Sequence, residues 1–131
     1  MNAKRDWGHA KDYIEMQWLM LQQNKPDDFV IATGKEFSVR DFVNCASSAL
    51  NMDITWEGQG LDEVGLWNGK VIVRVDPAYF RPTEVEELLG DASKARKKLG
   101  WTPKISFSDM VKEMVTHDYN QAKKSILLTK S

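Results

Sequence analysis

Apolar residues recur along this chain with helical spacing in some segments and alternate with polar residues in others. In the first periodic segment, which begins near His9, Tyr13, Ile14, Trp18 and Leu21 share one face of a predicted helix. Further apolar residues occupy most of the rest of its circumference. Such a helix is usually buried on more than one side, so this pattern indicates that the helix needs an additional partner surface. The proline within residues 24–27 ends it.

Three segments have the composition of strands, each with its own pattern. Residues 28–33 form a short apolar run typical of a buried strand, and Gly34 closes it. Residues 53–57 and 70–75 alternate between apolar and polar positions, as half-buried strands do. The residues between them, 58–69, contain four glycines and are predicted to form a glycine-rich loop.

Further helices are predicted from their start and stop signals over residues 39–50, 91–99 and 107–122. Ser38 and Asp41 resemble a capping box before the first of these, and Gly100 ends the second where left-handed geometry is needed. Trp101 is expected to pack between the last two helices. Because helices and strands alternate along the chain, the sequence predicts an α/β domain.

Composition narrows the class of protein. The chain has 131 residues, with 18 Lys and Arg against 19 Asp and Glu, which fits one near-neutral domain. This balance gives no general attraction to nucleic acid or to an acidic membrane. The single cysteine excludes a disulfide scaffold, and the longest apolar run, Trp18–Leu21, is far shorter than a membrane span. The first residues lack the apolar core of a signal peptide, so a cytoplasmic location is expected.

Several patterns that resemble chemical motifs are better explained by structural roles. Gly58-Gln-Gly60 lacks the following helix of a dinucleotide-binding turn, and we interpret it as a flexible loop. Tyr119 and Lys123 have the Tyr-x-x-x-Lys spacing of a catalytic pair, but Tyr119 lies on an apolar stripe. His9 is expected to form a hydrogen bond near a helix start, and Cys45 to pack within a helix. No Cys/His set has zinc-like spacing, so neither catalytic nor metal-binding residues are assigned.

Two arginines could bind a ligand. Arg5 lies just before a predicted helix, and Arg81 follows a predicted strand and precedes Pro82, which would hold the loop rigid. A guanidinium group binds phosphate oxygens through two parallel hydrogen bonds, and the nearby Glu84 could accept hydrogen bonds from a sugar diol. From residue chemistry alone, a surface ion pair is the commoner role for such arginines, so both interpretations stay open.

The same segments carry a resemblance to a known family, the GDP-mannose 4,6-dehydratases, which are extended short-chain dehydrogenases. The similar stretches occur in order from near residue 1 to about residue 125. They are Asn2-Ala-Lys-Arg-Asp-Trp-Gly-His-Ala-Lys-Asp-Tyr13, Trp18-Leu-Met-Leu-Gln-Gln23, Phe29-Val-Ile-Ala-Thr-Gly34, Val75-Asp-Pro-Ala-Tyr-Phe-Arg-Pro-Thr-Glu84, Leu88-Leu-Gly-Asp91 and Lys98-Leu-Gly-Trp-Thr-Pro103. The first and fourth stretches are specific to this family, whereas the Leu-Gly-Trp-x-Pro pattern is shared with other nucleotide-sugar enzymes.

The resemblance covers only the C-terminal third or so of such an enzyme. It implies that residues 1–131 form a single substrate-binding domain, a small mixed sheet with packed helices, without the N-terminal Rossmann domain. Family members use NADP to convert GDP-mannose to GDP-4-keto-6-deoxymannose, and the catalytic Thr, Glu, Tyr and Lys belong to that absent domain. No catalytic or cofactor-binding residue is therefore carried over, and whether the chain is an enzyme by itself stays undecided.

Substrate binding is the part of the family function that the resemblance does carry over. It implies that Arg5 and Arg81 approach the diphosphate and ribose of a GDP-sugar, with Glu84 placed for the ribose hydroxyls and Pro82 and Thr83 shaping the loop. The expected function is a GDP-sugar-binding portion that is inactive alone. Two alternatives remain: an interaction module that self-associates or docks through its apolar first helix, and one half of a split dehydratase completed by a Rossmann polypeptide.

Overall fold

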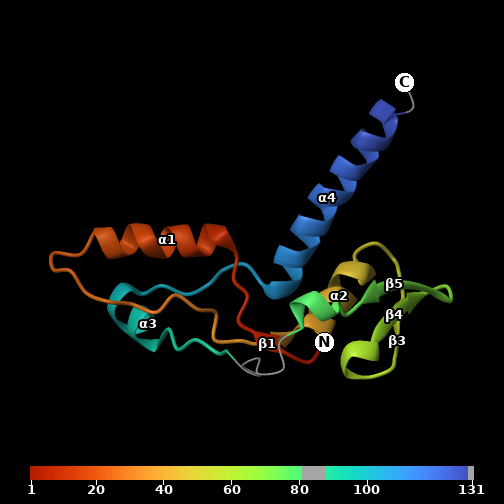
Figure 1. The fold of residues 1–131 in the computed structure, drawn as a ribbon. Helices are drawn as coiled ribbons and strands as arrows, with labels where there is room; N and C mark the ends of the chain where they lie inside the picture. Colours follow the sequence, from red (N-terminus) through yellow and green to blue (C-terminus); the bar gives the residue numbers. More distant parts are fainter. Residues whose placement is uncertain (81–87, 130–131) are drawn as a thin grey trace.

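The structure is a computed structural model that describes residues 1–80 and 88–129. Helices α1 (Ala10–Leu21) and α3 (Ser93–Leu99) lie at one end of the molecule, and a small β-sheet with helix α2 (Val39–Ser48) lies at the other (Figure 1). Helix α4 (Phe107–Thr129) begins near the middle and projects away from both parts (Figure 1). The chain therefore has two packed parts and a long helix that extends away from them.

The core of the first part is built around Trp101. Its buried members come from α1, α3 and the connecting segments: Met16, Ala32, Ala92, Ala95 and Trp101. The Trp101 indole N–H donates to the Asp12 carbonyl oxygen at 3.0 Å. The prediction that Trp101 packs between the last two helices is therefore confirmed for α3 and wrong for α4, because its other neighbour is α1. Its N–H needs a buried acceptor, and the carbonyl of Asp12 supplies one.

Residues 28–33 form an extended but irregular segment, so the strand predicted there is wrong. Within the described residues this segment pairs with no strand. Side chains bind its backbone instead: the Asp6 carboxylate accepts the Thr33 N–H at 2.9 Å, and Lys94 Nζ donates to the Asp28 carbonyl at 2.7 Å. An apolar run alone does not distinguish a strand from a segment held in this way.

The second part contains an antiparallel sheet of β3 (Thr55–Glu57), β4 (Val64–Trp67) and β5 (Lys70–Arg74). The strands predicted over 53–57 and 70–75 are confirmed, but β4 lies inside the predicted loop. Asn68 and Gly69 join β4 to β5 with φ angles of 50° and 72°, the geometry of a two-residue hairpin turn. Gly65 allows close packing in β4, since a Cβ there would lie 3.2 Å from Ile54, Trp56 and Val73. Gly65 thus serves close packing within a strand.

A two-stranded ribbon joins the two parts. Strand β1 (Lys4–Arg5) pairs antiparallel with β2 (Phe37–Ser38), and α2 follows directly. The capping box is confirmed: the Asp41 N–H donates to Ser38 Oγ at 3.0 Å, and Asp41 Oδ2 accepts the Ser38 N–H at 2.8 Å. The described strands therefore form two small antiparallel sheets where a single mixed sheet was predicted. The α/β class itself is confirmed.

The last two helices have the predicted signals at residues 100 and 106, but α3 begins at Ser93 and α4 extends to Thr129, beyond the predicted end at residue 122. Gly100 ends α3 with a φ of 67°, and Ser106 Oγ accepts the Asp109 N–H at 3.1 Å at the start of α4. Met110 and Val111 are buried, whereas Met114 and Tyr119 are 48% and 47% exposed. Only the first turns of α4 are therefore packed. Among the described residues, no helix is long and apolar enough to cross a membrane.

Candidate functional site

Arg5, the first residue expected to bind substrate, lies at the end of β1. It pairs with Phe37 of β2, is half-buried, and its Nη1 donates to the Lys4 carbonyl at 2.6 Å. The next side chain but one, Trp7, stacks against Phe107 and meets Phe42 edge to face, with ring centroids 5.8 and 5.2 Å apart. Arg5 is thus carried by a backbone held on one side by a strand and on the other by an aromatic cluster.

Arg81, Pro82, Thr83 and Glu84, the other residues expected to bind substrate, lie outside the described residues. The chain before them is held by Asp76, whose Oδ1 accepts the Ala78 N–H at 2.8 Å at the start of the short helix η2 (Pro77–Tyr79). The chain after them resumes at Leu88, whose carbonyl accepts the Asp6 N–H at 3.2 Å. The residue that follows Arg5 is therefore hydrogen-bonded to the residue that follows the 81–87 segment.

Asp6 binds two distant chain segments, at residues 33–34 and at Leu88, and sequence reasoning missed it. Its Oδ1 accepts the N–H and the hydroxyl of Thr33 at 2.9 and 2.5 Å, and its Oδ2 accepts the Gly34 N–H at 2.8 Å. Gly34 has a φ of 74°, a left-handed conformation that favours glycine. An Asp next to an Arg is easily interpreted as a local ion pair, so the sequence carries no signal for this long-range contact.

The start of α1 is fixed by polar contacts around His9. Its Nδ1 accepts the Lys11 N–H at 3.0 Å, which confirms the predicted hydrogen bond at a helix start. Its Nε2 lies 3.5 Å from a carboxylate oxygen of Glu113 on α4, and the Lys11 ammonium lies 3.2 Å from the other. The Lys11 hydrogen bond lowers the pKa of Glu113, with smaller contributions from its charge and from His9. These contacts join the first turns of α1 and α4.

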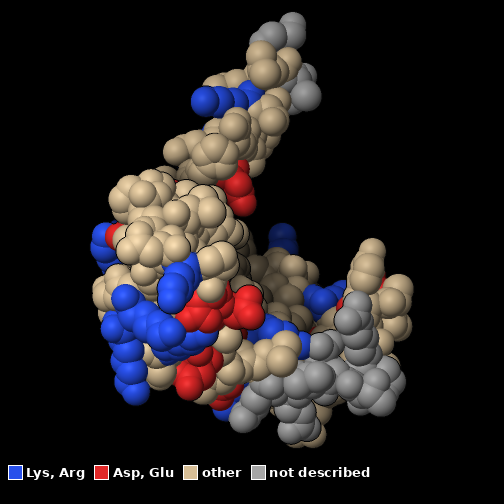
Figure 2. All heavy atoms as spheres, turned by 90° about the vertical axis from the view of Figure 1, so that its left-hand side faces the viewer, with Lys and Arg blue, Asp and Glu red and all other residues tan. Residues whose placement is uncertain are grey.

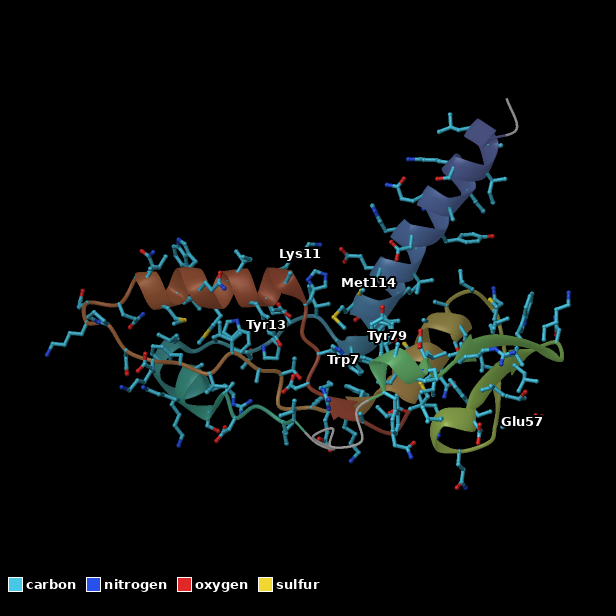
Figure 3. The ribbon with its side chains drawn as sticks, in the orientation of Figure 1. Trp7, Lys11, Tyr13, Glu57, Tyr79 and Met114 are labelled. Atoms are coloured by element: carbon cyan, nitrogen blue, oxygen red, sulfur yellow. The ribbon has the colours of Figure 1, made fainter. Side chains whose placement is uncertain are left out.

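Two further residues of α1 turn inward. Asp12 is buried, and its Oδ2 accepts the N–H groups of Lys104 and Ile105 at 3.1 and 3.0 Å. Tyr13 lies on the opposite side of α1 from Lys11 (Figure 3), and burial together with the charges of Asp6 and Asp12 raises its pKa. A Cβ on Gly8 would lie 2.3 Å from the Tyr13 hydroxyl, so the tyrosine fills the space beside that glycine.

The other residues that resembled chemical motifs in the sequence, Cys45, Tyr119 and Lys123, make contacts with neighbouring side chains. Cys45 is half-buried on α2, with Sγ 3.9 Å from Ser108 Oγ. Lys123 Nζ lies 4.2 Å from the centroid of the Tyr119 ring, a cation–π contact along the exposed side of α4. Tyr119 is on the expected stripe, but it is not buried, because α4 has left the packed body at that point.

A cavity of about 550 Å³ opens beside the second part of the molecule. Its lining residues are Asn2, Arg40, Trp56, Gly58, Gln59, Gly60 and Glu63. Glu63 is buried and accepts the Met1 amino group at 2.9 Å and Arg40 Nε at 3.0 Å. Burial raises the pKa of Glu63, but the hydrogen bonds and charges of these two cations outweigh it, so the net pKa is lowered. The Arg40 charge is thus largely compensated by its ion pair with Glu63.

The sequence profile of the family described as GDP-mannose 4,6 dehydratase matches residues 1–114. This match covers Arg5, the Asp6 contacts and the 81–84 segment. The chain belongs to the GDP-mannose 4,6-dehydratase family. A GDP-mannose 4,6-dehydratase of Vibrio cholerae is 52% identical over 98% of the chain, and one of Caenorhabditis elegans is 59% identical over 90%. The human protein is 53% identical over 90% of the chain.

The chain spans only about a third of the length of these dehydratases. It covers 38% of the Vibrio cholerae protein, 31% of the Caenorhabditis elegans protein and 32% of the human protein. The similarity therefore extends over almost all of this chain but over a minor share of each dehydratase.

Two solved structures have a similar fold at low sequence identity. The UDP-glucose 4-epimerase of Thermotoga maritima, in complex with UDP-glucose, has a TM-score of 0.68 at 21% identity, covering 92% of this chain and 33% of that one. RMD of Pseudomonas aeruginosa, in complex with NADPH, has a TM-score of 0.66 at 14% identity, covering 88% and 32%. At these identities the likeness shows the fold alone.

The described residues of this dehydratase-family chain do not fit a dinucleotide or a metal ion. Gly58 follows β3, and Gly60 is the first residue of the three-residue helix η1 (Gly60–Asp62), whereas a pyrophosphate needs a glycine turn that opens a longer helix. No group of three or more His, Cys, Asp or Glu side chains in the described part could hold a metal ion.

Proposed function

We propose that this chain is the C-terminal, substrate-binding portion of a GDP-mannose 4,6-dehydratase, that residues 1–131 form one domain, and that it binds a GDP-sugar through Arg5 and residues 81–84. The observation that carries the proposal is the family match over residues 1–114, which includes both segments. The hydrogen bond from the Asp6 N–H to the Leu88 carbonyl supports it further, because it joins the chain next to Arg5 with the chain next to residues 81–87.

The chemistry of these residues suits a nucleoside diphosphate. The two guanidinium groups, Arg5 and Arg81, would bind the diphosphate oxygens, and Glu84 would accept hydrogen bonds from the ribose hydroxyls. Pro82 and Thr83 would shape the loop between them. NADP, which the intact family uses, would belong to the portion of the relatives that lies outside this chain.

Binding by this portion is expected to be weak, and dehydratase activity is expected to be absent. A partial site lacks the contacts that offset the cost of association, and it does not exclude water from the sugar. The expected product in intact relatives is GDP-4-keto-6-deoxymannose. Turnover of GDP-mannose by the purified chain with NADP would contradict this part of the proposal.

Calorimetric titration with GDP-mannose tests the binding site. The wild-type chain and the Arg74→Ala variant, which loses an exposed arginine on β5, are expected to bind equally. Arg5→Ala and Arg81→Ala are each expected to weaken binding at least tenfold, because each loses a charge-assisted contact to phosphate. Equal heats for all four proteins would contradict the assignment of the two arginines.

A second candidate function, docking to the remaining portion of a dehydratase, is supported by the outer face of α1. Ile14, Trp18 and Leu21 lie along this face and are 62%, 58% and 81% exposed. Viewed from this end of the molecule, charged side chains gather over the region of α3, where Lys94 and Lys98 pair with Asp27 (Figure 2). The surface above them, over α1, is largely uncharged (Figure 2). An exposed apolar stripe of this kind is typical of an interface.

The partner we propose is the N-terminal two-thirds of a dehydratase polypeptide, because the relatives extend over about three times the length of this chain. Co-expression with that part of the Vibrio cholerae protein is expected to give a one-to-one complex by light scattering. Trp18→Glu should abolish it, whereas Trp67→Glu, on β4, should leave it intact. A homodimer that Trp18→Glu dissociates would show instead that a second copy covers α1.

A further inference from the structure

Arg5 can bind a ligand only if its backbone is held in one orientation. It belongs to a strand of two residues, β1, and its planar guanidinium stands at the end of a long side chain. Two pairs with β2, Lys4 with Ser38 and Arg5 with Phe37, fix one end of this segment. Beyond Arg5 the pairing ends, so the direction of the chain depends on what holds the next residue, Asp6.

Asp6 is held from three directions by the hydrogen bonds described above. Its two carboxylate oxygens accept the backbone N–H groups of Thr33 and Gly34 at 2.9 and 2.8 Å, and Oδ1 also accepts the Thr33 hydroxyl. Its own N–H donates to the Leu88 carbonyl at 3.2 Å. A carboxylate that accepts several N–H bonds forms stronger contacts than a neutral acceptor in the same place.

Successive side chains of an extended segment point to opposite sides. Fixing the Asp6 side chain toward Thr33 and Gly34 therefore fixes the side on which Arg5 leaves the backbone. The Thr33–Gly34 turn is suited to this contact, since Gly34 takes a left-handed φ of 74° and presents its N–H to Asp6. The Leu88 bond sets the distance between this segment and the chain that follows residue 87.

We infer that Asp6 is the positioning residue of the nucleotide-sugar site: it orients Arg5 and ties the Arg5 segment to the chain at Leu88. This inference rests on the proposed function for the role of Arg5 as a ligand-binding residue. Asp6 itself touches no substrate in this scheme, because both of its oxygens are bonded within the protein.

The test compares Asp6→Asn with a matched control, Asp41→Asn. The Asp41 carboxylate also accepts one backbone N–H and one hydroxyl, both from Ser38, but it does so in the capping box of α2. An asparagine at position 6 keeps an acceptor for Thr33 but turns a donor toward the Gly34 N–H when its oxygen takes the Oδ1 place. Both variants replace a hydrogen-bonded carboxylate by an amide and lose one negative charge, so an effect of the lost charge alone would appear in both.

Two measurements on the 131-residue chain separate positioning from stability. The first is the Kd for GDP-mannose by calorimetry, below the melting temperature of each variant. Asp6→Asn is expected to weaken binding about tenfold, or about 1.4 kcal/mol, with Asp41→Asn within twofold of wild type. The second is the NMR order parameter of the Arg5 side-chain Nε–H without ligand, which is expected to fall in Asp6→Asn only.

The outcomes distinguish the inference from the proposed function. If the wild-type chain does not bind GDP-mannose, the proposed function fails, and the order parameter of Arg5 still decides whether Asp6 orients it. If the wild-type chain binds but Asp6→Asn binds equally well, or if the Arg5 order parameter is unchanged, the positioning role of Asp6 is overturned. Equal losses of affinity in Asp6→Asn and Asp41→Asn would also overturn it, since they would indicate a general structural effect.

Discussion

The two packed parts of this molecule are stabilised in different ways. In the part that carries α1 and α3, here called the α1–α3 part, carboxylates bind irregular backbone: Asp6 binds residues 33–34, and Asp12 binds residues 104–105. In the β3–β5 sheet, backbone groups of neighbouring strands bind one another. Side chains such as Glu63 and Trp56 join this sheet to Arg40 and Asn44, but its backbone groups bind one another. In the α1–α3 part, irregular backbone depends on the carboxylates themselves. The proposed ligand site adjoins the α1–α3 part.

A large difference is expected between two tryptophans, one in each part. Trp101 is 2% exposed in the α1–α3 part, and Trp67 is 37% exposed on β4. Trp101→Ala is expected to lower the free energy of unfolding by about 3–5 kcal/mol, because it leaves a cavity and removes the bond to Asp12. Trp67→Ala should cost much less. Urea denaturation followed by circular dichroism measures both, and equal losses would contradict the assignment of Trp101 to a packed core.

Two glycines provide a smaller test of the same comparison. A Cβ on Gly90 would lie 2.2 Å from the Ala32 Cβ, whereas on Gly65 the nearest atoms of Ile54, Trp56 and Val73 lie at 3.2 Å. Gly65→Ala is expected to cost about 1–3 kcal/mol through overpacking. Gly90→Ala is expected to cost more, since the backbone near Ala32 must move. Thermal unfolding of both variants measures which one loses more stability. A larger loss of stability for Gly65→Ala than for Gly90→Ala would contradict this prediction.

The dependence on particular carboxylates can be measured with Asp12. Asp12→Ala leaves the N–H groups of Lys104 and Ile105 without their acceptor, at an expected cost of about 1–3 kcal/mol. Asp62→Ala removes an exposed carboxylate from η1 and is expected to change stability by about 0.5 kcal/mol or less. The free energies of unfolding in urea test the pair. A negligible effect of Asp12→Ala would show that water replaces its oxygen.

The smallest expected effects are changes of stability with pH. Stability is lost at acidic pH through Glu63 in the second part and at alkaline pH through Tyr13 in the α1–α3 part. The pKa of Glu63 is lowered from 4.5, so its contribution to stability is present above pH 4.5 and is lost as pH falls through its folded value. The pKa of Tyr13 is raised from 10.0, so its contribution is present below pH 10.0 and is lost as pH rises further.

Urea midpoints of the wild-type chain, Glu63→Gln and Tyr13→Phe at acidic, neutral and alkaline pH test these signs. The difference between wild type and Glu63→Gln should narrow as pH falls below 4.5. The wild type should lose stability relative to Tyr13→Phe as pH rises above 10.0. A difference that stays constant across the pH range would contradict the corresponding pKa direction.

The regular elements could be predicted because their signals are local. The capping box of Ser38 and Asp41, the left-handed end of α3 at Gly100 and the strands over 53–57 and 70–75 follow from residues close together in the chain. The turn that reveals β4, Asn68-Gly69, was also a local signal, and it was missed because the neighbouring glycines favoured a loop. For the site, the family resemblance supplied Arg5 and residues 81–84, while Asp6 was not found.

By itself, the sequence determined the α/β class, most of the helices, the capping residues and membership of the dehydratase family, since each depends on short patterns or direct similarity. The tertiary structure decided that residues 28–33 are not a strand, that Trp101 packs against α1 and α3, and that Asp6 joins the chain at Thr33, Gly34 and Leu88. These contacts link residues far apart in the chain. Their partners are chosen by burial and by the need to satisfy backbone hydrogen bonds, which no local pattern specifies.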